Sequence, residues 1–284
     1  MRALTLLALS LTSACRDDGA KAPAGNVRAS APAPSASERR SPPPGDATIS
    51  DGLLAPLSGT EPLVALPVAG FGDAVVSLPL GARTSVRSYV ALHGNFDRPE
   101  WQCDVWRGVV GNEAFVLCPR GIARSDVAKN LDRWTYPAFA KTEAEVLAAV
   151  AALERAYPGR VDRARMALMG FSLGAAHVAR LLERHGDRFP RAVLIEGGER
   201  GFTVNMARKF VTAGGEAVLF ACAQSVCTSR AKGAAKVLER SGARVRVFSA
   251  GNLGHTYDGA VAQGVGENLA WLWASSPPQP EPQR

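Results

Sequence analysis

Ser172 lies in a sequence pattern that suits a nucleophile. The apolar run that begins at Met166 predicts a buried strand, and the apolar spacing after the serine predicts a helix. A serine on such a strand-to-helix turn is exposed, and Gly170 and Gly174 leave room for neighbouring backbone. The helix N-terminus and the free N–H of Leu173 then face the oxygen that becomes negative during acyl transfer. In a chain with 28 glycines the pentapeptide Gly-Phe-Ser-Leu-Gly at residues 170–174 is weak support by itself. The alternative interpretation is a glycine-rich turn with a solvated serine.

A serine nucleophile needs a base, and the chain contains only four histidines. His177 lies in the helix predicted after the serine, where packing is the expected role, and His185 lies at the end of that helix, where a cation suits the helix dipole. His93 precedes the serine in another loop. His255 follows the last predicted strand, in the loop Gly-Asn-Leu-Gly-His-Thr-Tyr. We therefore expect His255 to be the general base, against the alternative of a loop histidine without function.

Elements of regular structure must bring these side chains together. Short apolar runs alternate with helical patterns, which is typical of a mostly parallel α/β sheet of about seven or eight strands with helices on both faces. The expected strands lie near residues 73–78, 85–92, 114–118, 166–170, 192–195, 217–223 and 244–249. Thr142 and Glu145 have the spacing of a capping box at the start of a helix. Two further helices are expected over residues 229–240 and 259–274.

The chain resembles the α/β-hydrolase superfamily, nearest to its dienelactone-hydrolase, carboxylesterase and polyhydroxybutyrate-depolymerase-like branches. The resemblance covers roughly residues 73–274 and rests on the serine turn, on the segment Val-Asp-Arg-Ala-Arg that leads into it, and on Val-Ala-Leu-His-Gly-Asn, a strand ending in His-Gly. In the family this His-Gly segment opens the oxyanion-hole loop. The resemblance therefore implies that the backbone N–H of Asn95, or less favourably of Gly94, is an oxyanion donor beside that of Leu173. It also implies ester hydrolysis through an acyl-enzyme, with no metal and no organic cofactor.

The acid of the catalytic triad departs from the family pattern. In most members it follows the second strand after the nucleophile, but the loop after residues 217–223 contains Cys227 and no carboxylate. Glu196 and Glu199 instead lie at the carboxyl end of the preceding strand, where some lipases of the fold carry their acid. Glu196 is our first choice and Glu199 the second, with Asp258 as a further candidate. A Ser-His dyad oriented by a backbone carbonyl is the remaining alternative.

The N-terminal fifty residues predict export. Arg2, the apolar stretch after it and the small residues before Cys15 are typical of a signal peptide of 15 residues, and the position of Cys15 resembles a bacterial lipobox, with Thr12 as a departure. A membrane-anchored lipoprotein in the periplasm or at the cell surface is expected, and a secreted protein is the alternative. Residues 16–50 and 276–284 have the composition of a disordered tether and tail around a domain at 51–275.

Four further cysteines remain after Cys15, an even number in a chain bound for an oxidising compartment, so we expect two disulfides. These cysteines allow three pairings, and the local one joins Cys103 to Cys118 and Cys222 to Cys227. It closes the shortest loops and is preferred without proof from the sequence. A zinc site is the competing use, but the expected His-Cys spacings are absent from the sequence.

Composition limits the classes of partner. The chain of 284 residues has a formal charge of +7, yet its lysines and arginines are scattered, which argues against nucleic-acid binding. Trp101, Trp106 and Trp134 follow core strands, and they could either floor a substrate pocket or pack in the core. The expected partners are a small or polymeric ester and, through the lipid anchor, a membrane. The alternatives are a peptidase or thioesterase with the same apparatus, and an inactive surface lipoprotein that binds a partner.

Overall fold

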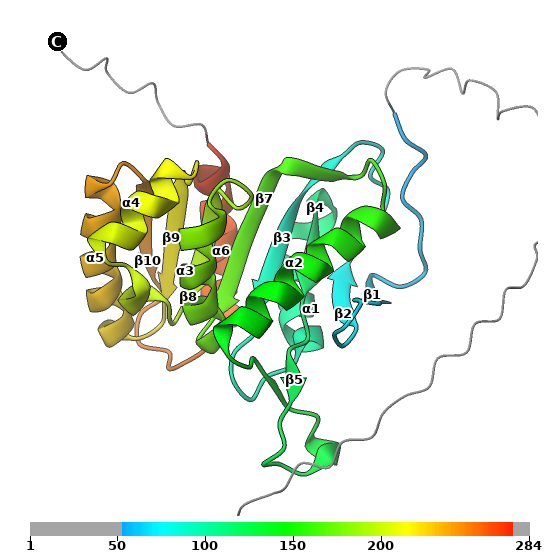
Figure 1. The fold of residues 1–284 in the computed structure, drawn as a ribbon, viewed down its shortest axis with the longest axis horizontal. Coiled ribbons are helices and arrows are strands. Elements are labelled where there is room, and N and C mark those ends of the chain that lie inside the picture. The colour runs from blue at the N-terminus through cyan, green and yellow to red at the C-terminus, as the bar shows by residue number, and fades with distance from the viewer. Residues whose placement is uncertain (1–52, 275–284) are drawn as a thin grey trace, which may run out of the picture. The chain divides into compact units, whose positions relative to one another are not determined.

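A computed structural model describes residues 53–274, which form an eight-stranded sheet with helices on both faces (Figure 1). The sheet order is β1-β2-β4-β3-β7-β8-β9-β10, and only the pairings of β2 with β1 and with β4 are antiparallel. The strands are β1 Leu63–Leu66, β2 Ala74–Ser77, β3 Val86–Leu92, β4 Ala114–Cys118, β7 Val161–Phe171, β8 Arg191–Ile195, β9 Ala217–Cys222 and β10 Arg244–Ser249. The predicted fold class is confirmed.

The strands in the middle of the sheet are mostly buried because helices cover both of their faces. All residues of β4, β8 and β9 are buried, and their sequences are continuous apolar runs, as expected of strands in a parallel sheet. β7 begins at Val161, five residues before the predicted start, with a partly exposed segment that the apolar pattern does not mark. Parallel pairing places the carboxyl ends of β3, β7, β8 and β9 along one edge of the sheet.

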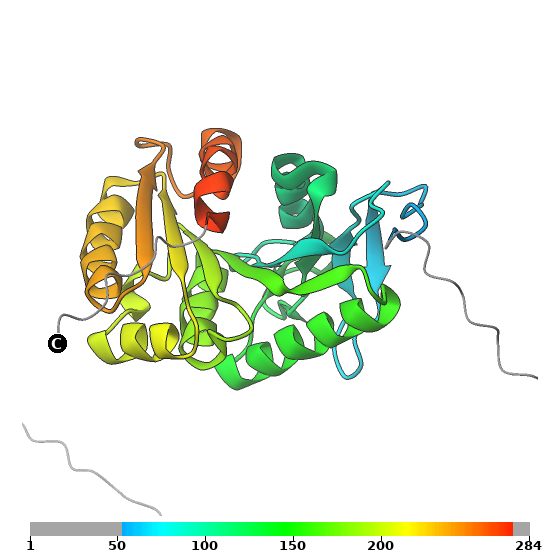
Figure 2. The same cartoon turned by 90° about the horizontal axis from the view of Figure 1, so that it is seen from above.

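Two apolar cores lie on opposite faces of this sheet. The helices α1 and α6 pack on one face, and α2, α3, α4 and α5 pack on the other (Figure 2). Their bounds are α1 Pro99–Val110, α2 Phe139–Ala156, α3 Leu173–His185, α4 Val204–Thr212, α5 Ser225–Arg240 and α6 Gly259–Trp273. None of the helices within residues 53–274 is long and apolar enough to span a membrane.

The capping-box prediction is wrong. α2 begins at Phe139, so Thr142 and Glu145 lie inside the helix and are buried. The carboxylate of Glu145 accepts the N–H of Gly121 at 2.8 Å instead of closing a cap. Burial raises the pKa of Glu145. Thr142 and Glu145 therefore lie in the interior of the helix, because the helix begins one turn earlier, at the buried Phe139.

Several elements have sequence signals too weak to predict. β1, α1 and α4 lie outside the expected ranges, and α5 begins four residues before the expected Ser229. Residues 122–135 form an excursion that contains the short strands β5 Ile122–Ala123 and β6 Trp134–Thr135, which pair with each other. We call residues 122–135 the hairpin excursion.

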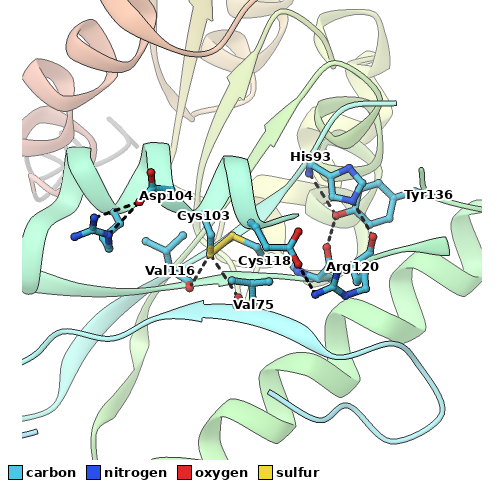
Figure 3. Close-up of a disulfide and its surroundings, with 11 residues drawn as sticks. Val75, His93, Cys103, Asp104, Val116, Cys118, Arg120 and Tyr136 are labelled. Carbon is cyan, nitrogen blue, oxygen red and sulfur yellow. Dashed lines mark hydrogen bonds and ion pairs between the residues drawn. A yellow bond between two sulfur atoms is a disulfide. The ribbon is translucent and has the colours of Figure 1, made fainter. Parts of the chain in front are cut away.

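Both expected disulfides are present in the local pairing. Cys103 of α1 is joined to Cys118 at the end of β4 (Figure 3), and Cys222 at the end of β9 is joined to Cys227 in the first turn of α5. The predicted signal peptide, Cys15, the tether at 16–50 and the tail at 276–284 lie outside the described residues.

Candidate active site

The backbone at Ser172 has the strained geometry of a nucleophile turn. Ser172 lies between the last residue of β7 and the first of α3, with φ of 53° and ψ of −113°. A Cβ at Gly174 would lie 2.1 Å from the carbonyl oxygen of Leu92, and one at Gly170 would lie 2.7 Å from backbone atoms of Ala175. Both glycines are therefore required by close backbone approach, and the side chain of Ser172 is left half-buried at the edge of the sheet.

The structure brings together the three side chains that the sequence nominates. Oγ of Ser172 lies 2.8 Å from Nε2 of His255, and Nδ1 of His255 lies 3.2 Å from Oε2 of Glu196. His255 is 47% exposed and its ring packs 4.8 Å from that of Phe171, so one face of the imidazole contacts protein while the site opens to solvent. A neutral His255 with its hydrogen on Nδ1 donates to Glu196 and presents a free Nε2 lone pair to the serine.

Glu196 is held by its surroundings in a single orientation. Its side chain is 1% exposed, and Oε1 accepts the backbone N–H of Ala223 at 2.5 Å. Its backbone has φ of 48°, so Ser172 and Glu196 are two of the four residues other than glycine that have a positive φ within residues 53–274. Glu199 lies elsewhere, in a short 3₁₀ turn with Oε1 3.7 Å from Nη1 of Arg230.

Two backbone N–H groups are free to face a developing oxyanion. Within residues 53–274, the N–H groups of Leu173 and Asn95 have no protein acceptor. The N–H of Gly94, the second choice from the sequence, faces Oδ2 of Asp97 at 3.4 Å. A Cβ at Gly94 would lie 3.5 Å from Cβ of Ser172, so the loop of residues 93–97, here called the oxyanion loop, passes directly beside the serine.

A buried network of contacts around His93 and Tyr136 holds this loop in place (Figure 3). Nδ1 and Nε2 of His93 lie 2.8 Å from the carbonyl oxygens of Gly94 and Arg120, respectively. The ring of His93 stacks on Tyr136, whose hydroxyl donates to the carbonyl of Pro119 at 2.8 Å. Burial lowers the pKa of His93. The loop is thereby attached to the end of β4, a role for His93 that sequence elimination did not provide.

Tyr257 and Asp97 connect the base to the oxyanion loop. The hydroxyl of Tyr257 donates to Oδ1 of Asp97 at 3.3 Å, and its ring packs 4.7 Å from Phe171. Burial raises the pKa of Tyr257. Sequence reasoning missed both residues, and the only available signal was that Tyr257 stands two residues after His255. Asp258 lies outside the triad and accepts the hydroxyl of Thr256 at 2.5 Å.

The other histidines and the tryptophans have mostly structural surroundings. His177 is buried and stacks on Phe139 with 6.1 Å between ring centroids, as predicted. His185 lies 2.9 Å from Glu143. Trp106 is fully buried in the core on the α1 side, which contradicts its use as a pocket floor, whereas Trp101 is 43% exposed and Trp134 is partly buried.

One group of potential metal ligands lies beside the site. An oxygen of Glu196 and the sulfur atoms of Cys222 and Cys227 lie within 4.8 Å of one another. The two sulfur atoms form a disulfide, so they do not present the thiolates that a zinc ion binds. These residues are therefore better explained as a disulfide that packs next to the carboxylate of Glu196 than as a metal centre.

The sequence matches no protein-family model and no curated protein. Solved structures do resemble the described chain. A carboxylesterase of Bacillus cereus has 19% identity and a TM-score of 0.52, covering 72% of this chain and 96% of that one. The fluorophosphonate-binding serine hydrolase F of Staphylococcus aureus has 14% identity and a TM-score of 0.55, covering 75% and 98%. The poly(aspartic acid) hydrolase-1 of a Sphingomonas species has 15% identity and a TM-score of 0.51, covering 74% and 98%. With the strand order of the sheet, these likenesses show that the chain has the α/β-hydrolase fold.

Proposed function

We propose that the protein is a serine hydrolase that cleaves carboxylic esters through an acyl-enzyme on Ser172. The observation that supports this most strongly is the continuous series of contacts from Ser172 through His255 to Glu196, at 2.8 and 3.2 Å. Several solved structures with this fold are named carboxylesterase or serine hydrolase. The fold alone hosts many activities, so the proposal rests on the site.

The proposed reaction uses each of these groups in turn. Nε2 of His255 takes the hydroxyl proton as Oγ of Ser172 attacks the ester carbonyl, and the N–H groups of Leu173 and Asn95 stabilise the oxyanion. His255 then returns the proton to the leaving alcohol as the carbon–oxygen bond breaks. A water molecule, activated by the same imidazole, releases the acid and regenerates Ser172. Glu196 stabilises the imidazolium in both halves of the cycle.

Ester hydrolysis by purified variants tests this proposal. The wild type is expected to hydrolyse p-nitrophenyl butyrate, while Ser172→Ala and His255→Ala lose at least a thousandfold in kcat, on the order expected when a triad member is removed. Ser229→Ala, which changes an exposed serine on α5, is the matched control and should retain wild-type turnover. Equal turnover by Ser172→Ala and Ser229→Ala contradicts the proposal.

We further propose that the enzyme is exported and held at a membrane by acylated Cys15. The support is the signal-like segment at residues 1–15 and the two disulfides, which suit an oxidising compartment. Cys15→Ser should move the protein from the membrane fraction to the soluble fraction of cells that express it. Retention of Cys15→Ser in the membrane fraction contradicts the anchor.

A further inference from the structure

The hairpin excursion is hydrogen-bonded to the oxyanion loop. The N–H of Phe96 donates to the carbonyl of Trp134 at 3.0 Å, and the N–H of Trp134 donates to the carbonyl of Asp97 at 2.9 Å. In Figure 1 the chain around β5 projects beyond the end of the sheet. A group bound against Phe96 therefore lies next to Asn95, one of the two proposed oxyanion donors.

A cavity of about 550 Å³ lies within the hairpin excursion, and its charged lining is mostly cationic. Arg124, Lys129 and Arg133 contribute three positive charges, and Asp132 contributes the one negative charge. Asp132 is already engaged, because it forms an ion pair with Arg98 outside the cavity lining and accepts Nε1–H of Trp134 at 2.8 Å. The cavity thus has an excess of positive charge that its own carboxylate does not neutralise.

The three cations differ in their partners. Arg124 is paired with Asp126, and its Nη1 donates to Oδ1 of Asn95 at 2.5 Å. Arg133 donates to the carbonyl of Leu131 at 2.8 Å, but within residues 53–274 neither Arg133 nor Lys129 forms an ion pair with a carboxylate. Two positive charges in this cavity therefore lack a counter-charge on the described chain.

Aromatic rings hold the guanidinium of Arg133 in place. Its central carbon lies 4.6 Å from the ring centroid of Trp101 and 5.5 Å from that of Phe96, both of which are exposed. Stacking of this kind orders the side chain but uses the faces of the guanidinium, so N–H groups along its edges remain available. A planar guanidinium edge pairs with a carboxylate through two parallel hydrogen bonds.

We propose that this cavity is a subsite for a carboxylate group that the ester substrate itself carries, with Arg133 and Lys129 as the residues that bind it. The inference rests on the proposed ester hydrolysis and adds the class of substrate. The carboxylate lies in the cavity while the ester carbonyl lies between Ser172 and Asn95. The subsite then selects anionic esters over neutral esters of the same length.

A matched pair of substrates tests this selectivity. Mono-p-nitrophenyl glutarate and p-nitrophenyl pentanoate have acyl chains of similar length and differ in the terminal carboxylate. The wild type should have the higher kcat/KM for the glutarate ester, and the Arg133→Gln, Lys129→Gln double variant should lose roughly tenfold to hundredfold of that ratio, as expected for charge-assisted hydrogen bonds. Added salt should lower the wild-type ratio as well.

Arg155→Gln is the matched control, because Arg155 is exposed near the end of α2, far along the helix from the hairpin excursion. It should retain the wild-type ratio, and thermal melting should show that all variants are folded. A wild type without preference for the glutarate ester, or a double variant that keeps the preference, overturns the subsite while hydrolysis of the pentanoate upholds the proposed function. A wild type that hydrolyses neither ester overturns both the subsite and the proposed function.

Discussion

Ser172 and Glu196 share a feature that the sequence does not display, since both have a positive φ without being glycine, at 53° and 48°. Left-handed backbone costs an ordinary residue roughly 1–2 kcal/mol. Such strain persists only where the surroundings enforce it, here parallel pairing of β7 with β8 and the hydrogen bond from Ser172 N–H to the carbonyl of Ile195. This backbone conformation directs both side chains towards His255.

Replacement of the carboxylate should separate the two glutamates. In Glu196→Gln the amide no longer stabilises the imidazolium of His255, so kcat should fall by roughly a thousandfold or more. Glu199→Gln, three positions along the chain, should keep turnover within about twofold because the carboxylate of Glu199 faces Arg230 and does not contact His255. Steady-state kinetics on a neutral ester measures both, and equal, mild losses in the two variants would refute the assignment of Glu196.

At the scale of elements, the segment after β9 supports the acid rather than supplying it. Ala223 gives its N–H to Glu196, and its carbonyl accepts the N–H of Leu253, which lies in the loop of His255. The Cys222–Cys227 disulfide encloses this residue. The segment that lacks a carboxylate thus orients two members of the proposed triad.

Removal of this disulfide should therefore reduce turnover. Cys222→Ala with Cys227→Ala is expected to lower kcat by about tenfold with a smaller change in KM, because a misplaced carboxylate weakens transition-state stabilisation. The comparison variant, Cys103→Ala with Cys118→Ala, opens a loop with a separation of 15 residues and should cost about 3 kcal/mol in the free energy of unfolding. Kinetics and denaturant unfolding separate the two effects, and unchanged kcat without Cys222 and Cys227 would contradict the role of Ala223.

The sequence predicts the elements whose patterns are local and leaves out those fixed by tertiary contacts. The seven predicted strands all appear. The clearest signals come from β4, β8 and β9, because buried parallel strands are continuous apolar runs. α1 and the hairpin excursion escape prediction because α1 carries charged residues among its apolar ones and β5 and β6 contain two residues each. Ser172 could be nominated from its motif and His255 by elimination among four histidines. The first choice of Glu196 over Glu199 gains its support from the fold, which places Glu196 against Nδ1 of His255.

At the scale of the whole molecule, buried histidines connect stability to pH. Burial lowers the pKa of His177 from 6.5 to about 4, and Nδ1 of this residue has no hydrogen-bond partner among residues 53–274. The unfolded chain therefore binds a proton at a higher pH than the folded one does. Stability from this residue is complete above about pH 6.5 and is lost as the pH falls towards 4.

Denaturant unfolding between pH 7 and pH 4 should show this loss, with a slope of at most about 1.4 kcal/mol per pH unit from one histidine. His177→Gln should reduce the dependence of the unfolding free energy on pH. His185→Gln, on the same helix, keeps the buried imidazole of His177 and should leave this dependence unchanged. Burial also lowers the pKa of His93, which contributes in the same direction in all three proteins. Parallel curves for the wild type and His177→Gln would count against the assignment.

Covalent labelling can determine whether Ser172 is a nucleophile that His255 activates. A fluorophosphonate should add one probe mass to the folded wild-type protein, and peptide mass spectrometry should place it on Ser172. The adduct should be absent from Ser172→Ala and form far more slowly on His255→Ala. A folded wild type that takes up no probe, or carries it on another residue, contradicts the role of Ser172 as nucleophile and favours a binding protein with a hydrolase fold.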